Sequence, residues 1–231
     1  MKTTVFIPAK NEEARIARCL ERLDARTCDP VVLVNDTTDR TVEIARNFGA
    51  VVIETHVPGK LPAIQNAMRL MHHEVQRTGV AVIDADTVPL FPKTWLRALT
   101  QPVGTSPTMV VGPVIWQPSG FKCIPDRALR TVRGELVSRR PESSLVNEAN
   151  MFFLPDGTIL EDMLALRHVF PGEGVAMRAS FTDHGGTYKR AGLRASVLTS
   201  DRFLSKKCRD RKDWRERYRE RAPEGSIEPT I

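Results

Sequence analysis

Two aspartates separated by one residue are the first feature of the sequence that suggests chemistry. In the segment VAVIDADTVP (80–89), an apolar run ends at Ile83 and is followed directly by Asp84-Ala85-Asp86. If the run is a strand of a parallel sheet, these carboxylates lie at the edge where the carboxyl ends of the strands meet, which is where such sheets bind ligands. Polar residues follow two further predicted strands and would share that edge: Asn11 and Glu12, then Asn35 and Asp36.

Several carboxylates at one edge would repel one another, and a divalent cation relieves that repulsion. Mg2+ and Mn2+ prefer oxygen ligands, and such sites use one or two carboxylates and complete the metal's coordination with substrate phosphates. The pattern therefore predicts a nucleotide diphosphate held through Mn2+ or Mg2+ at this edge.

The elements that must position these residues alternate between strand and helix four times in the first 90 residues. Such alternation predicts an α/β fold, a mostly parallel central sheet with helices on both faces. The predicted strands cover 3–9, 30–36, 50–56, 80–86 and 108–116. The predicted helices cover 11–23, 39–49, 62–77, 91–101 and 160–170. We expect Asn11 to be the N-cap of the first one.

The bulk composition is that of an ordinary globular protein. The chain has 231 residues, of which 41% are hydrophobic and 27% charged, and no apolar run is long enough to span a bilayer. The opening MKTTVFIPAKNEE reads as a first strand and not as a signal peptide. None of the four cysteines forms a C-x-x-C pair, which disfavours a disulfide framework and favours the cytoplasm.

Four blocks of the first 90 residues resemble those of the family 2 glycosyltransferases, which have the GT-A fold. They are TVFIPAKNEEARIARCLERL, VVLVNDTTDRTVEIARNFGA, GKLPAIQNAMRL and VIDADTVP, in the order that the family shows. The resemblance implies a glycosyltransferase of the hexosyltransferase type that uses a nucleotide-sugar donor. It further implies a nucleotide-binding half over 1–90 and an acceptor-side half over 91–200, together forming a GT-A domain over 1–200.

Carried over position by position, the resemblance implies roles for individual residues. Asp36 would face the base, Lys60 would lie near the nucleotide, Asp84 would touch ribose or metal, and Asp86 would bind the metal. The other residues implied to contact the nucleotide sugar are Pro8, Ala9 and Glu12 around base and ribose, together with Asn11, Ala85 and Asn150. For Asn150, in the segment NEANMFF, contact with the acceptor and a place in a buried edge strand are the alternatives. Departures from the family pattern at Asn35, Thr37-Thr38 and Leu61-Pro62 leave the base and the sugar open.

Inverting transfer needs a base that takes the proton from the acceptor hydroxyl. In this family the base is usually the aspartate of an E-D pair at the start of a helix, which implies Asp162 beside Glu161 in ILEDMLALRHVF. The segment FTDHGGTYKRAG offers Asp183 as a rival base and His184 as a third metal ligand. An acidic helix start and a structural histidine are the alternative interpretations of these residues.

The C-terminal residues 201–231 form a basic tail that we expect to be a charged helix or partly disordered. Residues 202–221 hold ten Lys or Arg against four Asp or Glu, a net charge of +6 that equals that of the whole chain. Three interpretations stay open: a solvated helix that packs Trp214 and Tyr218 on the body, a contact with an anionic membrane surface that makes the protein peripheral to it, and a contact with nucleic acid.

These interpretations of the tail do not select the acceptor, which is a lipid, a glycan, a protein, a small molecule or a modified DNA base.

Two other functions compete with glycosyl transfer. A sugar nucleotidyltransferase shares the core, but it usually has a Gly/Arg/Lys-rich loop where this chain reads AKNEEAR. A non-catalytic nucleic-acid-binding protein on a GT-A core is disfavoured by the intact aspartates, and an NAD-type enzyme by the lack of G-x-G-x-x-G after the first strand.

Overall fold

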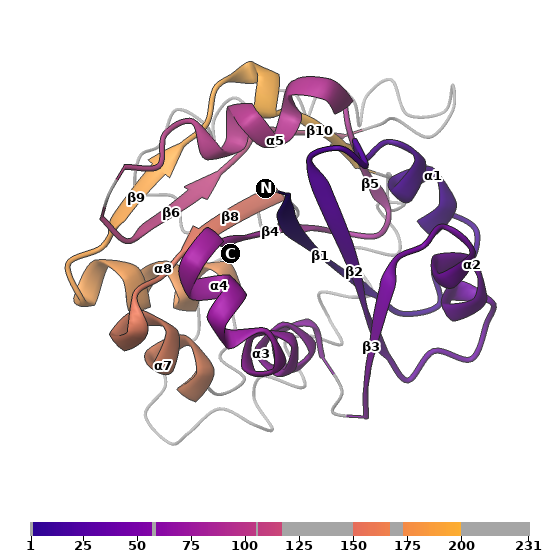
Figure 1. Ribbon diagram of the computed structural model, residues 1–231, viewed down its shortest axis with the longest axis horizontal. Coiled ribbons are helices and arrows are strands. Elements are labelled where there is room, and N and C mark those ends of the chain that lie inside the picture. Colours follow the sequence, from indigo (N-terminus) through magenta and orange to yellow (C-terminus); the bar gives the residue numbers. More distant parts are fainter. Residues whose placement is uncertain (1, 57–58, 105, 117–149, 167–172, 200–231) are drawn as a thin grey trace, which may run out of the picture.

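The computed structural model describes residues 2–56, 59–104, 106–116, 150–166 and 173–199. A seven-stranded sheet forms its centre, with the strand order β3-β2-β1-β4-β8-β6-β9 (Figure 1). The basic tail and the segment 117–149 lie outside the described residues, so the expectations for Trp214 and Tyr218 do too. No helix in the described ranges is long and apolar enough to cross a membrane.

The strands of the large sheet are β1 (Thr3–Ala9), β2 (Cys28–Asn35), β3 (Val51–Thr55), β4 (Val80–Ile83), β6 (Thr108–Val111), β8 (Asn150–Leu154) and β9 (Thr187–Arg190). The helices are α1 (Ile16–Glu21), α2 (Thr41–Asn47), α3 (Lys60–Leu70), α4 (His72–Thr78), α5 (Pro92–Thr100), α7 (Gly157–Ala165) and α8 (Glu173–Asp183). A second, smaller sheet has the order β5-β10-β7 and is built from β5 (Thr87–Pro89), β10 (Val197–Thr199) and β7 (Val114–Trp116).

Six of the seven strands of the large sheet run in the same direction. β3, β2, β1 and β4 pair in parallel, while β8 is antiparallel to both β4 and β6. β6 therefore runs in the direction of β4, and β9 is parallel to β6. The predicted mostly parallel sheet is confirmed, and the carboxyl ends of β1, β2, β3 and β4 share one edge, which we call the rim.

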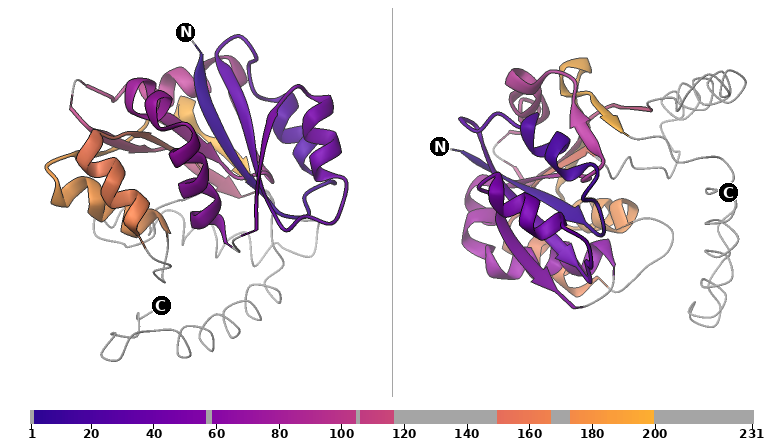
Figure 2. Two further views of the ribbon diagram at one scale, coloured as in Figure 1. Left: turned by 60° about the horizontal axis from the view of Figure 1, so that its bottom comes forward. Right: turned by 90° about the vertical axis from the view of Figure 1, so that its right-hand side faces the viewer.

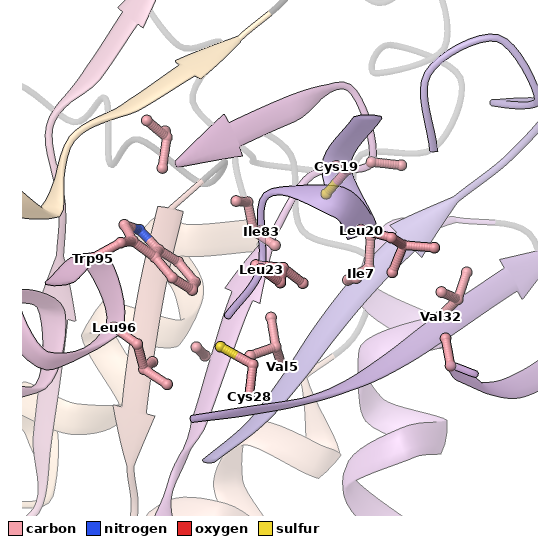
Figure 3. Close-up of a cluster of buried hydrophobic side chains, with 14 of the residues drawn as sticks. Val5, Ile7, Cys19, Leu20, Leu23, Cys28, Val32, Ile83, Trp95 and Leu96 are labelled. Atoms are coloured by element: carbon pink, nitrogen blue, oxygen red, sulfur yellow. The ribbon is translucent and has the colours of Figure 1, made fainter. Parts of the chain in front are cut away.

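Helices cover both faces of the sheet, as predicted (Figure 2). On one face α1, α2 and α5 bury Ile16, Cys19, Leu20, Ala45 and Trp95 against the strands, and Figure 3 shows part of this cluster around Val5, Ile7 and Ile83. On the other face α3, α4, α7 and α8 do the same with Ile64, Met68, Val75, Ile159 and Phe181. Burial of these side chains fixes each helix on the sheet, since each large aliphatic or phenylalanine side chain among them contributes roughly 1.5–3 kcal/mol.

Four boundaries differ from the sequence-based predictions. The helix expected over 62–77 is two helices, because the chain leaves helical geometry at Met71. The strand expected over 108–116 is divided by Gly112-Pro113, where proline has no N–H to give to a sheet. Asn11 does not cap α1, because its backbone has φ 53° and the helix begins only at Ile16.

The fourth difference concerns the helix that carries the E-D pair. It begins at Gly157, and Asp156 is its N-cap, with a side chain that accepts a hydrogen bond from Ile159 N at 2.9 Å. The sequence-based prediction began this helix at the Glu161-Asp162 pair, but Asp156 is the residue with the spacing to a free backbone N–H that capping requires. Glu161 and Asp162 therefore lie in the middle of α7 and not at its start.

Candidate active site

An ion pair joins the end of β4 to the start of α3 at the rim. Lys60 Nζ lies 2.6 Å from Asp84 Oδ1, and the two side chains are 20% and 34% exposed. Lys60 follows Gly59, whose φ of 121° favours glycine and whose carbonyl accepts a hydrogen bond from Asn35 Nδ2 at 2.9 Å. The ends of β2 and β4 and the start of α3 are thus held together, as the predicted grouping of Asp84 and Lys60 requires.

The second aspartate of the pair is held by hydroxyl groups from the small sheet. Asp86 Oδ1 lies 3.2 Å from Thr87 Oγ1 and 3.4 Å from Thr199 Oγ1. The two hydroxyls are 2.9 Å apart, because Thr87 and Thr199 are directly opposed in the antiparallel pairing of β5 with β10. Asp86 therefore depends on a strand that is distant in sequence.

A buried thiol lies beneath the two aspartates. Cys19 of α1 is fully buried, and its Sγ is 3.8 Å from the carbonyl oxygen of Asp84. Burial raises the pKa of the thiol well above its usual range, and the nearby carboxylates of Asp84 and Asp86 raise it further. Cys19 is therefore a neutral thiol at physiological pH and not a thiolate ligand for a metal.

The loops after β1 and β2 bring the predicted base-side residues to the rim. Pro8 and Ala9 end β1 beside Leu33 and Val34 of β2. Asp36 comes directly after β2, is exposed, and has an Oδ1 atom 4.0 Å from His56 Nδ1. Asn11 and Glu12 lie in the loop after β1, exposed and half-buried respectively. Ala85 is 2% exposed and belongs to the core, so its methyl group is turned away from the surface.

Asn150 differs from its predicted role. It begins β8 opposite Ile83, but its side chain is fully buried. Its Oδ1 accepts a hydrogen bond from Trp95 Nε1 at 3.1 Å, and its Nδ2 donates to Ala195 O at 2.7 Å and to Pro113 O at 3.3 Å. Because both the oxygen and the nitrogen of its amide are hydrogen-bonded within the protein, Asn150 links buried segments to one another instead of contacting a sugar.

Asp162, Asp183 and His184 also differ from their predicted roles, because the topology places them away from the rim. His184 comes three residues before the start of β9, which runs parallel to β6 and β4, so Asp183 and His184 lie at the opposite edge of the sheet. His184 Nε2 is 3.7 Å from Asp162 Oδ2, which ties Asp162 to the same region. The neighbouring Glu161 pairs with His72 Nε2 at 3.6 Å instead.

One residue at the rim was not among the predicted site residues. Thr199 was missed because a threonine in a short strand gives no signal until its partner across the strands is known. Its hydroxyl lies 2.9 Å from that of Thr87 and 3.4 Å from Asp86 Oδ1.

The side chains at the rim suit a hard cation with part of its coordination left to a ligand. Carboxylate and hydroxyl oxygens of Asp84, Asp86 and Thr199 are the donor atoms that Mg2+ and Mn2+ prefer. No cluster of three or more His, Cys, Asp or Glu that could hold a metal occurs in the described part of the chain. His184 is thus not brought to the aspartates as a third ligand, and the donor set instead fits an ion that shares its coordination with phosphates.

Comparison with solved structures supports the fold. Glucosyl-3-phosphoglycerate synthase from Mycobacterium tuberculosis, in complex with Mn2+, UDP-glucose and phosphoglyceric acid, superposes with a TM-score of 0.58 and 20% identity over 89% of this chain and 74% of that one. Its complex with Mn2+, UDP and phosphoglyceric acid gives 0.59 and 19% identity over 100% and 82%. At these identities the likeness shows the fold alone, and it confirms the GT-A architecture.

Sequence comparison supplies the family. Two uncharacterized glycosyltransferases, from Rickettsia typhi and Rickettsia prowazekii, are 48% and 46% identical to this chain over 52 residues. The aligned segment covers 22% of this chain and only 18% of either relative. The model of glycosyl transferase family 2 matches residues 4–153, which contain β1 to β8 and both aspartates after β4. The chain therefore belongs to glycosyl transferase family 2.

Proposed function

We propose that this protein transfers a sugar from a nucleotide-diphosphate sugar to an acceptor hydroxyl, with inversion at the sugar carbon. The observation that carries the proposal is the arrangement of Lys60, Asp84 and Asp86 at the carboxyl ends of the parallel strands. It places one ammonium group and two carboxylates where a doubly wound sheet binds nucleotides. Family membership makes glycosyl transfer the reaction to test first.

Each rim residue has a role in this proposal. Asp86 would hold Mn2+ or Mg2+, and the ion would supply positive charge to stabilise the departing diphosphate. Lys60 fixes the orientation of Asp84 through their 2.6 Å ion pair, and Asp84 would accept a hydrogen bond from the ribose or join the metal. Pro8, Ala9, Glu12 and Asp36 line the pocket for base and ribose, which lies between the ends of β1 and β2. Structures of glucosyl-3-phosphoglycerate synthase, which is similar in fold, are complexes with Mn2+ and UDP-glucose and with Mg2+ and UDP, which supports the choice of ions.

We propose that the base that removes the proton from the acceptor hydroxyl is a carboxylate on the rim side of the sheet and is neither Asp162 nor Asp183. Both of those residues lie towards the other edge, where His184 Nε2 is 3.7 Å from Asp162 Oδ2. A carboxylate within hydrogen-bond reach of the acceptor suffices for this step. The variants Asp162→Asn and Asp183→Asn should therefore bind donor and retain transfer as the wild type does.

Thermal stabilisation tests the donor site directly. The protein is melted with UDP, GDP, CDP, TDP or ADP and their common sugars, with and without Mn2+, because a ligand that binds only the folded state raises the melting temperature. One diphosphate should stabilise the protein only when metal is present, and Asp86→Asn should abolish that effect. Stabilisation by nucleoside triphosphates with release of pyrophosphate would instead indicate a sugar nucleotidyltransferase.

The acceptor follows once the donor is known. Phosphoglyceric acid accompanies the similar structures, so small phosphorylated hydroxy acids are the first class to screen, followed by lipid phosphates, glycans, proteins and DNA with hydroxylated bases. Radiolabelled transfer from the identified donor reports on all of these classes. Transfer to DNA or lipid that disappears when 201–231 are removed would give the basic tail a role in recruiting the acceptor.

A further inference from the structure

Backbone amides of the loop after β1 donate hydrogen bonds to side chains that follow β2. Glu12 N donates to Thr41 Oγ1 at 2.9 Å, and Glu13 N donates to Asp39 Oδ2 at 3.0 Å. The loops involved are loop A (residues 10–15) and loop B (residues 36–40), and Thr41 is the first residue of α2. Each bond spans 26 or more residues of sequence, so each one joins two separate strand ends.

The same two loops are also joined in the opposite direction. Thr38 N donates to Asn11 Oδ1 at 2.9 Å, and Arg40 N donates to Glu13 Oε2 at 3.1 Å. Four backbone amides therefore donate across the loops, two in each direction, and the Thr38 hydroxyl adds a fifth bond, to Asn11 Oδ1 at 3.4 Å. This reciprocal arrangement fixes the distance between the loops and also their relative orientation.

Asp39 and Thr41 form the most protected part of this network. Thr41 is fully buried, and its backbone N and its hydroxyl both donate to Asp39 Oδ1. Burial would raise the pKa of Asp39, but the hydrogen bonds from Thr41 and from Glu13 N outweigh it and lower that pKa. Because the single hydroxyl proton of Thr41 is given to Asp39, the oxygen of Thr41 is left to accept from Glu12 N.

The backbone on either side of the network is in a conformation that needs support. Asn11 in loop A has φ 53°, and Asp36 at the start of loop B has φ 43°. Residues other than glycine seldom occupy this left-handed region, and they remain there when neighbouring contacts fix them. Asn11 supplies one of the four cross-loop acceptors, so the network and the unusual backbone support each other.

We infer that Asp39 and Thr41 are positioning residues for the nucleotide pocket. They hold loops A and B in one relative arrangement, so that Glu12 and Asp36 face the base and ribose before the donor arrives. The inference rests on the proposed function, since it requires a nucleotide between these loops. Neither Asp39 nor Thr41 needs to touch the ligand, because they act by keeping the binding-competent arrangement populated.

The test compares Thr41→Val, which keeps the shape and removes the hydroxyl, with Thr41→Ser, which restores it. Thr100→Val is the matched control, because the hydroxyl of Thr100 bonds only to carbonyls of its own helix α5. For each variant the measurements are the affinity for the nucleoside diphosphate that stabilises the wild type with Mn2+, the melting temperature, and hydrogen exchange of the Glu12 and Glu13 amides in the folded protein without ligand.

Thr41→Val should bind the nucleotide about ten-fold more weakly, measured at a temperature far below melting. Apparent affinity falls in proportion to the fraction of molecules whose loops A and B are in the binding arrangement, so a ten-fold loss corresponds to a fall of that fraction to about one tenth. Its Glu12 and Glu13 amides should exchange faster, and Thr41→Ser should restore both properties. A lowered melting temperature with unchanged affinity and exchange would overturn the inference and leave Thr41 a purely structural residue. If the wild type binds no nucleotide, the proposed function itself fails. If the wild type binds and Thr41→Val binds equally well, only the inference about Thr41 fails.

Discussion

Replacing Asn150 with alanine decides whether this residue contacts the sugar or braces the interior. The side-chain amide of Asn150 takes part in three hydrogen bonds. It accepts one from Trp95 Nε1 and donates one each to the carbonyl oxygens of Ala195 and Pro113. Asn150→Ala leaves all three partners buried without their bonds. At about 1 kcal/mol for each bond, the loss of unfolding free energy is about 3 kcal/mol, or more if no water enters to replace the amide.

Urea unfolding monitored by tryptophan fluorescence and circular dichroism measures this loss. For a chain of this length, about 3 kcal/mol corresponds to a fall in melting temperature of roughly 6–12 °C. Donor affinity measured well below that temperature should stay within about two-fold of the wild type. The control is Gln76→Ala, since Gln76 is a half-buried amide on α4, on the opposite face of the sheet.

Two results would refute the reasoning. A variant that loses less than about 1 kcal/mol would show that the three bonds make no net contribution in solution. A variant of wild-type stability that binds the donor at least ten-fold more weakly would return Asn150 to the sugar-contacting role expected from its position in the sequence.

Three further predictions concern charge and capping. Asp86→Asn should remove the metal-dependent part of nucleotide affinity while leaving the melting temperature of the free protein near that of the wild type, as calorimetry and thermal shift can check. Asp156→Ala should lower the unfolding free energy by about 1 kcal/mol through loss of the N-cap of α7, and Asp156→Ser should recover most of it. The pKa of Asp39 is lowered in the folded protein, so the stability that it contributes is fully present above its unfolded pKa of about 3.9 and is lost as the pH falls through the folded pKa. The stability difference between the wild type and Asp39→Asn, from urea unfolding between pH 6 and pH 3, should therefore shrink in acid; a constant difference would contradict this.

The alternating pattern was enough to predict the sheet and the edge at which its polar residues gather. Val5, Phe6 and Ile7 or Val80 to Ile83 are apolar at every position, as buried parallel strands are, and the polar residues that follow them meet at the rim as expected. Short-range cues such as the helix face of Ile16, Cys19 and Leu20 also held. These features depend on local sequence, so they could be predicted without knowledge of the tertiary contacts.

The second half of the site could not be predicted in the same way. The acids at 161, 162 and 183 have equally plausible helix contexts in the sequence, and only the direction of β8 and β9 shows which edge they occupy. Strand direction in a mixed sheet depends on pairing between distant segments, which periodicity does not reveal. The burial of Asn150 is a further example, because its partners Trp95 and Ala195 lie 55 and 45 residues away.

The hydroxyl pair at Asp86 has a consequence for the order in which the protein is made. Thr87 and Thr199 are separated by 112 residues, so the strand that braces this aspartate emerges from the ribosome long after both carboxylates have been synthesised. A nascent chain that has reached the end of β8 can pair β1, β2 and β4 and already carries Asp84 and Asp86. Until β10 pairs with β5, Asp86 lacks the hydroxyl of Thr199, so early folding of the first strands does not by itself complete the rim.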